Sequence, residues 1–160
     1  MLKYVDTALV FQEIPDETTL AISLSKCPCR CPGCHSRYLW DDVGEPLDVA
    51  ALDGLLAANR VGVSCVCFMG GDAAPTEVQR LAEHLHSHHP TLRVAWYTGR
   101  PCVSADVDRN RFDYIKVGPY IAHLGPLTSP KTNQHLYKKL PDNTWTDITP
   151  RFWRQTYPNH

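Results

Sequence analysis

The sequence has no long apolar run: no stretch approaches the roughly 20 residues that a membrane-spanning helix needs. It also has no excess of charge, since 16 basic residues stand against 17 acidic ones. The composition therefore gives no reason to expect electrostatic binding to nucleic acid or to a membrane surface. The first residues, M-L-K-Y-V-D-T, contain no signal-peptide core. We expect a cytoplasmic protein.

Internal repeats and low-complexity segments are also missing. The seven cysteines are an odd number, which argues against a framework of disulfides and for reduced thiols. With 43% hydrophobic residues, a chain of 160 residues can bury the core of one domain. We therefore expect a single domain over residues 1–160. From about residue 127 to 160 the sequence predicts an irregular tail that packs on the domain or on a partner.

One short stretch concentrates the metal-binding side chains. Five potential ligands fall within nine residues: Cys27, Cys29, Cys31, Cys34 and His35. Two prolines and Gly33 within the stretch exclude an ordinary helix or central strand, so it is predicted to be a loop. Cys27, Cys31 and Cys34 give the spacing C-x3-C-x2-C, which can place three thiolates around one iron–sulfur cube. Clusters that only carry electrons are usually held by four cysteines. Three cysteines leave one iron of a four-iron cluster without a protein ligand, and that iron can bind a substrate, as the open position of a catalytic zinc does.

Other metal or redox chemistries fit this loop less well. The pattern C-x-x-C-H from Cys31 to His35 matches c-type haem attachment, but that chemistry belongs to exported proteins. C-P-G-C resembles a dithiol redox motif, but that interpretation leaves Cys27 and Cys29 unused. A structural zinc site is the serious alternative, although such sites more often pair two separated C-x-x-C motifs. The spacing favours an iron–sulfur cluster over zinc.

Hydrophobic patterns along the chain predict strands that alternate with helices. Strands are expected at 4–12, 18–25, 63–69, 92–97 and 114–117, and helices at 47–59 and 76–88. The first two strands can form a hairpin, and the later alternation implies βα units with a parallel sheet. Because an eight-unit barrel typically needs about 250 residues, we expect an α/β fold with a partial, incomplete β/α barrel of mostly parallel strands.

Turn-rich segments follow four of the predicted strands: C-P-C-R-C-P-G-C, G-G-D, Y-T-G-R and K-V-G-P-Y. In parallel α/β folds, ligands bind at the carboxyl ends of the strands. The four segments are therefore expected to meet at one rim. Two glycines in G-G-D would let the backbone approach a ligand closely, and Asp72 can pair with an ammonium group.

These motifs resemble those of the radical S-adenosylmethionine (SAM) enzymes, which share the C-x3-C-x2-C loop and use a G-G-E or G-G-D turn to hold the amino group of SAM. Within that superfamily the chain is similar to the activating proteins of anaerobic (class III) ribonucleoside-triphosphate reductases. The similarity covers nearly the whole chain. It includes C-P-C-R-C-P-G-C-H-S, F-M-G-G-D-A-A-P, W-Y-T-G-R, Y-I-K-V-G-P-Y and T-N-Q-H-L-Y. It implies that the partial barrel is of the radical SAM type.

The resemblance implies a mechanism. Cys27, Cys31 and Cys34 would hold a [4Fe–4S] cluster, and SAM would chelate the fourth iron. An electron from a flavodoxin-like or other low-potential donor would cleave SAM to methionine and a 5′-deoxyadenosyl radical. That radical would remove a hydrogen atom from a glycine of the partner reductase and leave a stored glycyl radical. No catalytic residue is implied beyond the cluster and SAM.

The resemblance also implies a set of SAM-binding residues: Gly33, Cys34, His35, Gly70, Gly71, Asp72, Thr98 and Lys116. Many radical SAM proteins have an aromatic residue where this chain has Gly33, so His35 or Tyr38 is expected to pack the adenine. Two alternatives stay open: an activator of a different glycyl-radical enzyme, and a non-catalytic zinc-binding interaction module.

The remaining cysteines and a group of histidines are expected to have ordinary roles. Cys65 and Cys67 lie two apart on a predicted strand and should be small buried hydrophobes, and Cys102 should be a free thiol. Because helical spacing scatters them over different faces, the four histidines near the end of the second helix should form a solvated helix terminus. They are His84, His86, His88 and His89.

Overall fold

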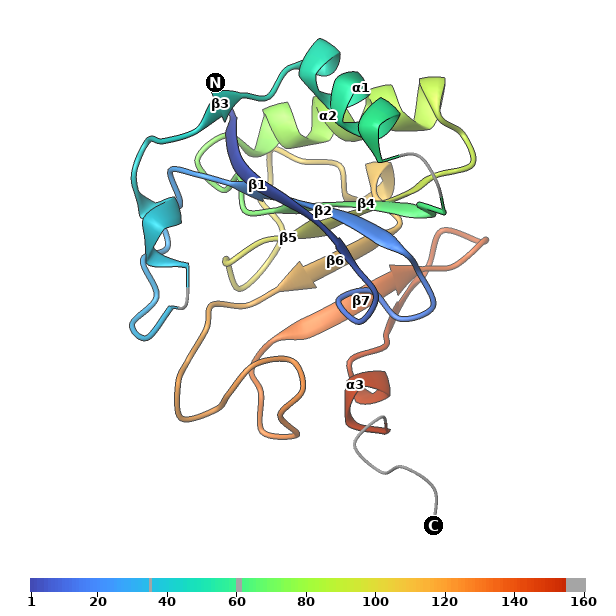
Figure 1. The fold of residues 1–160 in the computed structure, drawn as a ribbon. Coiled ribbons are helices and arrows are strands. Elements are labelled where there is room, and N and C mark those ends of the chain that lie inside the picture. The colour runs from blue at the N-terminus through green and yellow to red at the C-terminus, as the bar shows by residue number, and fades with distance from the viewer. Residues whose placement is uncertain (35, 60–61, 155–160) are drawn as a thin grey trace.

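The computed structural model describes residues 1–34, 36–59 and 62–154. Within these residues the strands form one eight-stranded sheet of order β3-β1-β2-β4-β5-β6-β7-β8 (Figure 1). The strands are β1 (Lys3–Val10), β2 (Thr19–Leu24), β3 (Glu45–Pro46), β4 (Cys65–Met69), β5 (Arg93–Tyr97), β6 (Tyr114–Val117), β7 (His135–Lys139) and β8 (Trp145–Asp147). The α-helices are α1 (Val49–Ala58), α2 (Pro75–His88) and α3 (Pro150–Arg154), and two short 3-10 helices are η1 (Arg37–Trp40) and η2 (Arg109–Arg111).

The sheet is parallel in its centre and antiparallel on both flanks. β2, β4, β5 and β6 pair in parallel, whereas β1 pairs antiparallel with β2 and β3, and β7 with β6 and β8. The predicted mixed α/β fold is confirmed. The expectation of mostly parallel strands is wrong for the described sheet, because four of its seven pairings are antiparallel. The outer strands are joined without crossover helices, and such connections return the chain antiparallel.

A continuous apolar layer lies between the sheet and the two longer helices. Ile22, Phe68, Trp96 and Ile115 form a row across the four parallel strands, and all belong to the main buried cluster. Both α1 and α2 cover this face (Figure 1). Burying aromatic and branched side chains here supplies most of the driving force for folding.

Local signals define where these two helices start. The side chain of Asp48 caps α1 by accepting a hydrogen bond from the N–H of Ala51 at 2.8 Å. Pro75 stands in the first turn of α2, where its missing N–H costs nothing.

No helix of the described ranges is long and apolar enough to cross a membrane.

The opposite face of the sheet is covered largely by the C-terminal part of the chain. Leu127, Leu136 and Phe152 are buried there in one cluster with Cys65 and Cys67. The sequence predicts an irregular tail after about residue 127, but the structure places β7, β8 and α3 in that region. These short outer strands show little alternation in sequence. The pairing of β7 with β6 and of β8 with β7 supplies the order that local propensity lacks.

Candidate functional site

The loops that follow the four parallel strands meet at the carboxyl edge of the sheet. The cysteine loop (residues 25–36) follows β2, and the other three loops follow β4, β5 and β6. Backbone hydrogen bonds join these neighbours: the N–H of Gly70 donates to the carbonyl of Tyr97 at 3.0 Å, and that of Gly118 to Arg100 at 2.7 Å. Convergence at one edge is the expected consequence of a parallel arrangement.

The cysteine loop is fixed at its root by the segment that returns from η1. The N–H of Cys27 donates to the carbonyl of Leu39 at 2.8 Å. Lys26 and Arg30 have positive φ angles of 61° and 45°, so the chain turns sharply on either side of the first cysteines. The Arg30 guanidinium lies over the Trp40 ring, 5.5 Å from its centroid. These contacts hold the loop against η1.

The four thiols of the cysteine loop are all free and only partly buried, namely Cys27, Cys29, Cys31 and Cys34. A tight turn brings the N–H of Cys34 to the carbonyl of Cys31 at 3.0 Å. The Cys34 sulfur accepts a hydrogen bond from the N–H of Ser36 at 3.4 Å.

The spacing of these sulfurs does not suit a single tetrahedral ion. Neighbouring sulfurs around one zinc lie about 3.8 Å apart, given Zn–S bonds of about 2.3 Å. Among the described residues, no three cysteine sulfurs lie within 4.8 Å of one another. Cysteine sulfur is the usual ligand of iron–sulfur clusters, so these free side chains are chemically suitable donors for such a group.

Cys29 differs from the other thiols of the loop because it contacts a carboxylate. Its sulfur donates to Asp72 Oδ2 across 3.6 Å. Burial, together with the negative charges of Asp72 and Cys27, raises the pKa of Cys29 to about 12. Cys29 therefore donates to Asp72 as a neutral thiol.

Asp72 lies at the centre of the hydrogen-bond network that joins the loops. It is only 7% exposed, yet its carboxylate is well satisfied. Thr98 donates its hydroxyl to Oδ1, and the N–H of Gly99 donates to Oδ2 at 2.9 Å. With the Cys29 thiol, three donors from two loops surround one carboxylate. The structure thus brings together Asp72 and Thr98, two of the residues expected to bind SAM.

The two glycines before Asp72 are required by packing. Gly70 and Gly71 have φ angles of 108° and 87°, which other residues rarely adopt. A Cβ atom on Gly71 would lie 2.5 Å from the side chain of Val78 and 2.9 Å from that of Leu24. Both glycines therefore let the turn pack closely against α2 and β2. The expected close approach to a ligand stays a prediction.

Lys116, another expected SAM-binding residue, is buried beneath the loops. Its ammonium donates to the carbonyls of Thr98 at 3.2 Å and Gly118 at 3.1 Å. Burial lowers its pKa, and the negative charges of Asp72 and Cys31 oppose that shift. Lys116 therefore ties the loops after β5 and β6 together and places a positive charge close to the carboxylate and the thiols.

The structure also adds residues that the sequence analysis did not select. A Cβ atom on Gly99 would stand 2.9 Å from the sulfur of Cys29, so this glycine makes room for the Cys29–Asp72 contact. A Cβ atom on Gly33 would lie 3.5 Å from the ring of Tyr120, which brings the cysteine loop close to the loop after β6. The added residues are Gly99, which lies in the turn-rich segment Y-T-G-R, and Tyr120, which lies in K-V-G-P-Y. These two segments were the signal that the sequence offered.

The two residues expected to pack the adenine have different outcomes. Tyr38 lies on η1, about half exposed, and its hydroxyl donates to Asp6 on β1 at 2.8 Å. His35 lies outside the described residues. The structure therefore gives Tyr38 a partner on the first strand and leaves the expected role in adenine binding a prediction.

No family model, curated protein or solved structure matches this chain. Free thiols, one buried carboxylate and one buried ammonium meet where parallel strands end. Such a set can ligate a metal cluster through sulfur and hold a cationic group of a ligand through the carboxylate.

Proposed function

We propose that this protein is a radical SAM activase that generates a glycyl radical on an anaerobic ribonucleoside-triphosphate reductase. One observation carries the proposal: a three-cysteine loop of C-x3-C-x2-C spacing lies beside a buried aspartate in the loop that follows the neighbouring parallel strand. The parallel centre of the sheet, with its loops at one edge, supports an incomplete barrel of the radical SAM type.

In this proposal the cluster and SAM have distinct protein ligands. Cys27, Cys31 and Cys34 would hold three irons of a [4Fe–4S] cluster, which leaves one iron open to SAM. Asp72 would accept the ammonium of SAM. Its contact with Cys29 is long at 3.6 Å and is the weakest of its three, so an ammonium group can replace it without disturbing Thr98 or Gly99.

The bound cluster would supply the electron that breaks a carbon–sulfur bond of SAM, after reduction by a flavodoxin-like or other low-potential donor. The chain itself would position the reactants and exclude water. Lys116 supports this role because it fixes two loops at the rim and offsets the negative charge of Asp72 and Cys31. Thr98 holds the Asp72 carboxylate in place.

Anaerobic reconstitution with iron and sulfide tests the proposal. With a reductant and SAM, the reconstituted protein should release 5′-deoxyadenosine and methionine. With a class III reductase present, a glycyl-radical signal should appear in its electron paramagnetic resonance spectrum. SAM cleavage without that signal, but with one on another glycyl-radical enzyme, would identify a different activase. Binding of zinc by the loop cysteines, without any SAM cleavage, would leave the zinc-binding module as the function.

A further inference from the structure

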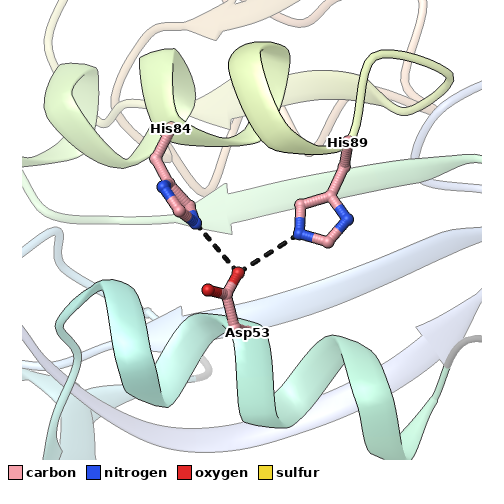
Figure 2. Close-up of side chains that lie close together, drawn as sticks. All are labelled: Asp53, His84 and His89. Carbon is pink, nitrogen blue, oxygen red and sulfur yellow. Dashed lines mark hydrogen bonds and ion pairs between the residues drawn. The ribbon is translucent and has the colours of Figure 1, made fainter.

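A second group of potential metal ligands lies between α1 and α2. Figure 2 shows Asp53 of α1 pointing toward α2, where His84 and His89 point back at it. The Nε2 atom of His84 lies 2.9 Å from Asp53 Oδ1, and the Nε2 atom of His89 lies 3.2 Å from the same oxygen. Among the described residues, this is the one group of three ligand atoms within 4.8 Å of one another.

The end of α2 explains how two histidines five residues apart reach one point. On a regular helix they would lie about 140° apart around the axis, since each residue advances by about 100°. The helix ends at His88, and Pro90 disfavours helical geometry at the residue before it. His89 accordingly has φ −134° and ψ 64°. The expectation of histidines scattered over a solvated helix end is therefore wrong for His84 and His89.

The geometry of the group resembles that of metal ligands. Adjacent ligands of a tetrahedral zinc lie about 3.3 Å apart, because Zn–N bonds are about 2.0–2.1 Å. The two distances to Asp53 Oδ1, 2.9 and 3.2 Å, are close to this separation.

Surrounding contacts fix these side chains before any ion binds. The His84 side chain is only 12% exposed, and the His88 ring stacks on it with centroids 4.3 Å apart. Asp53 follows Leu52, whose buried side chain anchors this part of α1 in the core. Asp53, His88 and His89 also line a hollow of about 480 Å³ beside the group, which gives an ion and a water molecule access.

We propose that Asp53, His84 and His89 bind a Zn²⁺ ion that links α1 to α2. Two imidazoles and one carboxylate provide three ligands, and a water molecule from the hollow completes the tetrahedron. This site uses none of the residues of the cysteine loop and does not depend on the proposed activase function. The bound ion would stabilise the folded chain, because it binds three ligands that only folding brings together.

Zinc titration of the full chain tests the site. We expect the double variant His84→Gln/His89→Gln to bind one equivalent of zinc less than the wild-type chain. His135→Gln is the matched control, because His135 also pairs with one aspartate, Asp147, at 2.9 Å, but no second histidine of the described residues joins that pair. The control should keep the wild-type number of equivalents. Equal zinc binding by the double variant and the wild type would overturn the proposal.

A second measurement separates this ion from any zinc held by thiols. In the full chain with Cys27→Ser, Cys29→Ser, Cys31→Ser and Cys34→Ser, one equivalent of zinc should still bind and raise the melting temperature. Adding Asp53→Asn should weaken that binding by more than the roughly 10–100-fold that losing an outer-shell partner costs. Absence of zinc binding in the serine-substituted chain, shown folded by circular dichroism, would contradict the proposed site.

Discussion

Two groups of cysteines in this chain have opposite surroundings. The four of the cysteine loop are partly exposed at the edge of the sheet, whereas Cys65 and Cys67 are fully buried within β4. Burial raises the pKa of both strand thiols far above the usual value. The same side chain therefore serves as a candidate metal ligand in a proline-containing loop and as a small hydrophobe in a strand. Backbone context decides between the two.

The sharpest test of that contrast removes one sulfur at a time. Cys27→Ala, Cys31→Ala and Cys34→Ala should each lose the four-iron cluster and abolish SAM cleavage, because each removes one of three protein ligands. Cys67→Ala should retain the cluster. Iron and sulfide analysis after anaerobic reconstitution provides the measurement. Full activity in any of the three loop variants would break the assignment.

Asp72 is expected to have the next largest effect, on SAM affinity. A carboxylate–ammonium hydrogen bond contributes about 1.5–3 kcal/mol. Asp72→Ala should therefore weaken SAM binding by roughly ten- to a hundredfold, at about 1.4 kcal/mol per decade. The cluster should survive, since no sulfur is removed. Equilibrium binding to the reconstituted protein measures the effect.

Two milder changes at the same position serve as controls. Asp72→Glu keeps the charge and should be the mildest change. Asp72→Asn keeps the size and an acceptor for Gly99 but removes the charge, so it should weaken binding nearly as much as alanine. Unchanged SAM affinity in Asp72→Ala, with the cluster intact, would reduce G-G-D to a structural turn.

Buried strand cysteines should respond in stability and not in chemistry. Cys67→Ser places a hydroxyl in an apolar layer between Ala21 and Ala95 of the neighbouring strands. We expect a loss of about 1–3 kcal/mol in the free energy of unfolding. Urea denaturation measures it, with the exposed Cys102→Ser as control at less than about 0.5 kcal/mol. Equal stability of the two variants would remove the distinction between the cysteine groups.

The smallest effect is expected at Cys29. Its thiol donates to Asp72 and is held protonated, so Cys29→Ser should keep the wild-type iron content and preserve a hydrogen bond to the carboxylate. Metal analysis of the reconstituted variant checks this expectation. A loss of iron equal to that of Cys31→Ala would make Cys29 a cluster ligand. The proposed set of three ligand cysteines would then be wrong.

Sequence patterns predicted the centre of the fold better than its edges. The range 114–117 coincides with β6, and α1 and α2 lie within or next to their predicted ranges. These elements are signalled by local apolar periodicity and by capping residues. The β1–β2 hairpin was also expected, because its two strands are close in sequence. β3, β7, β8 and α3 were not predicted, because they are short and their order depends on contacts with the rest of the sheet.

The same division holds for the candidate sites. The cysteine loop is one contiguous stretch, so its donors could be selected directly from the sequence. Asp53 and His84 are 31 positions apart and meet only because α1 packs on α2. Gly99 was visible in Y-T-G-R, but its contact with Cys29 depends on how two loops are placed in space. Proximity of this kind is set by tertiary packing and has no local signature.

The central claim is that three loop cysteines hold a four-iron cluster whose open iron binds SAM. The most direct measurement is the electron paramagnetic resonance spectrum of the anaerobically reconstituted, reduced protein with and without SAM. We predict about four iron atoms per chain and a cluster signal that changes when SAM is added. Wild-type protein whose loop cysteines take up zinc in place of iron, or a cluster signal unaffected by saturating SAM, would contradict the claim.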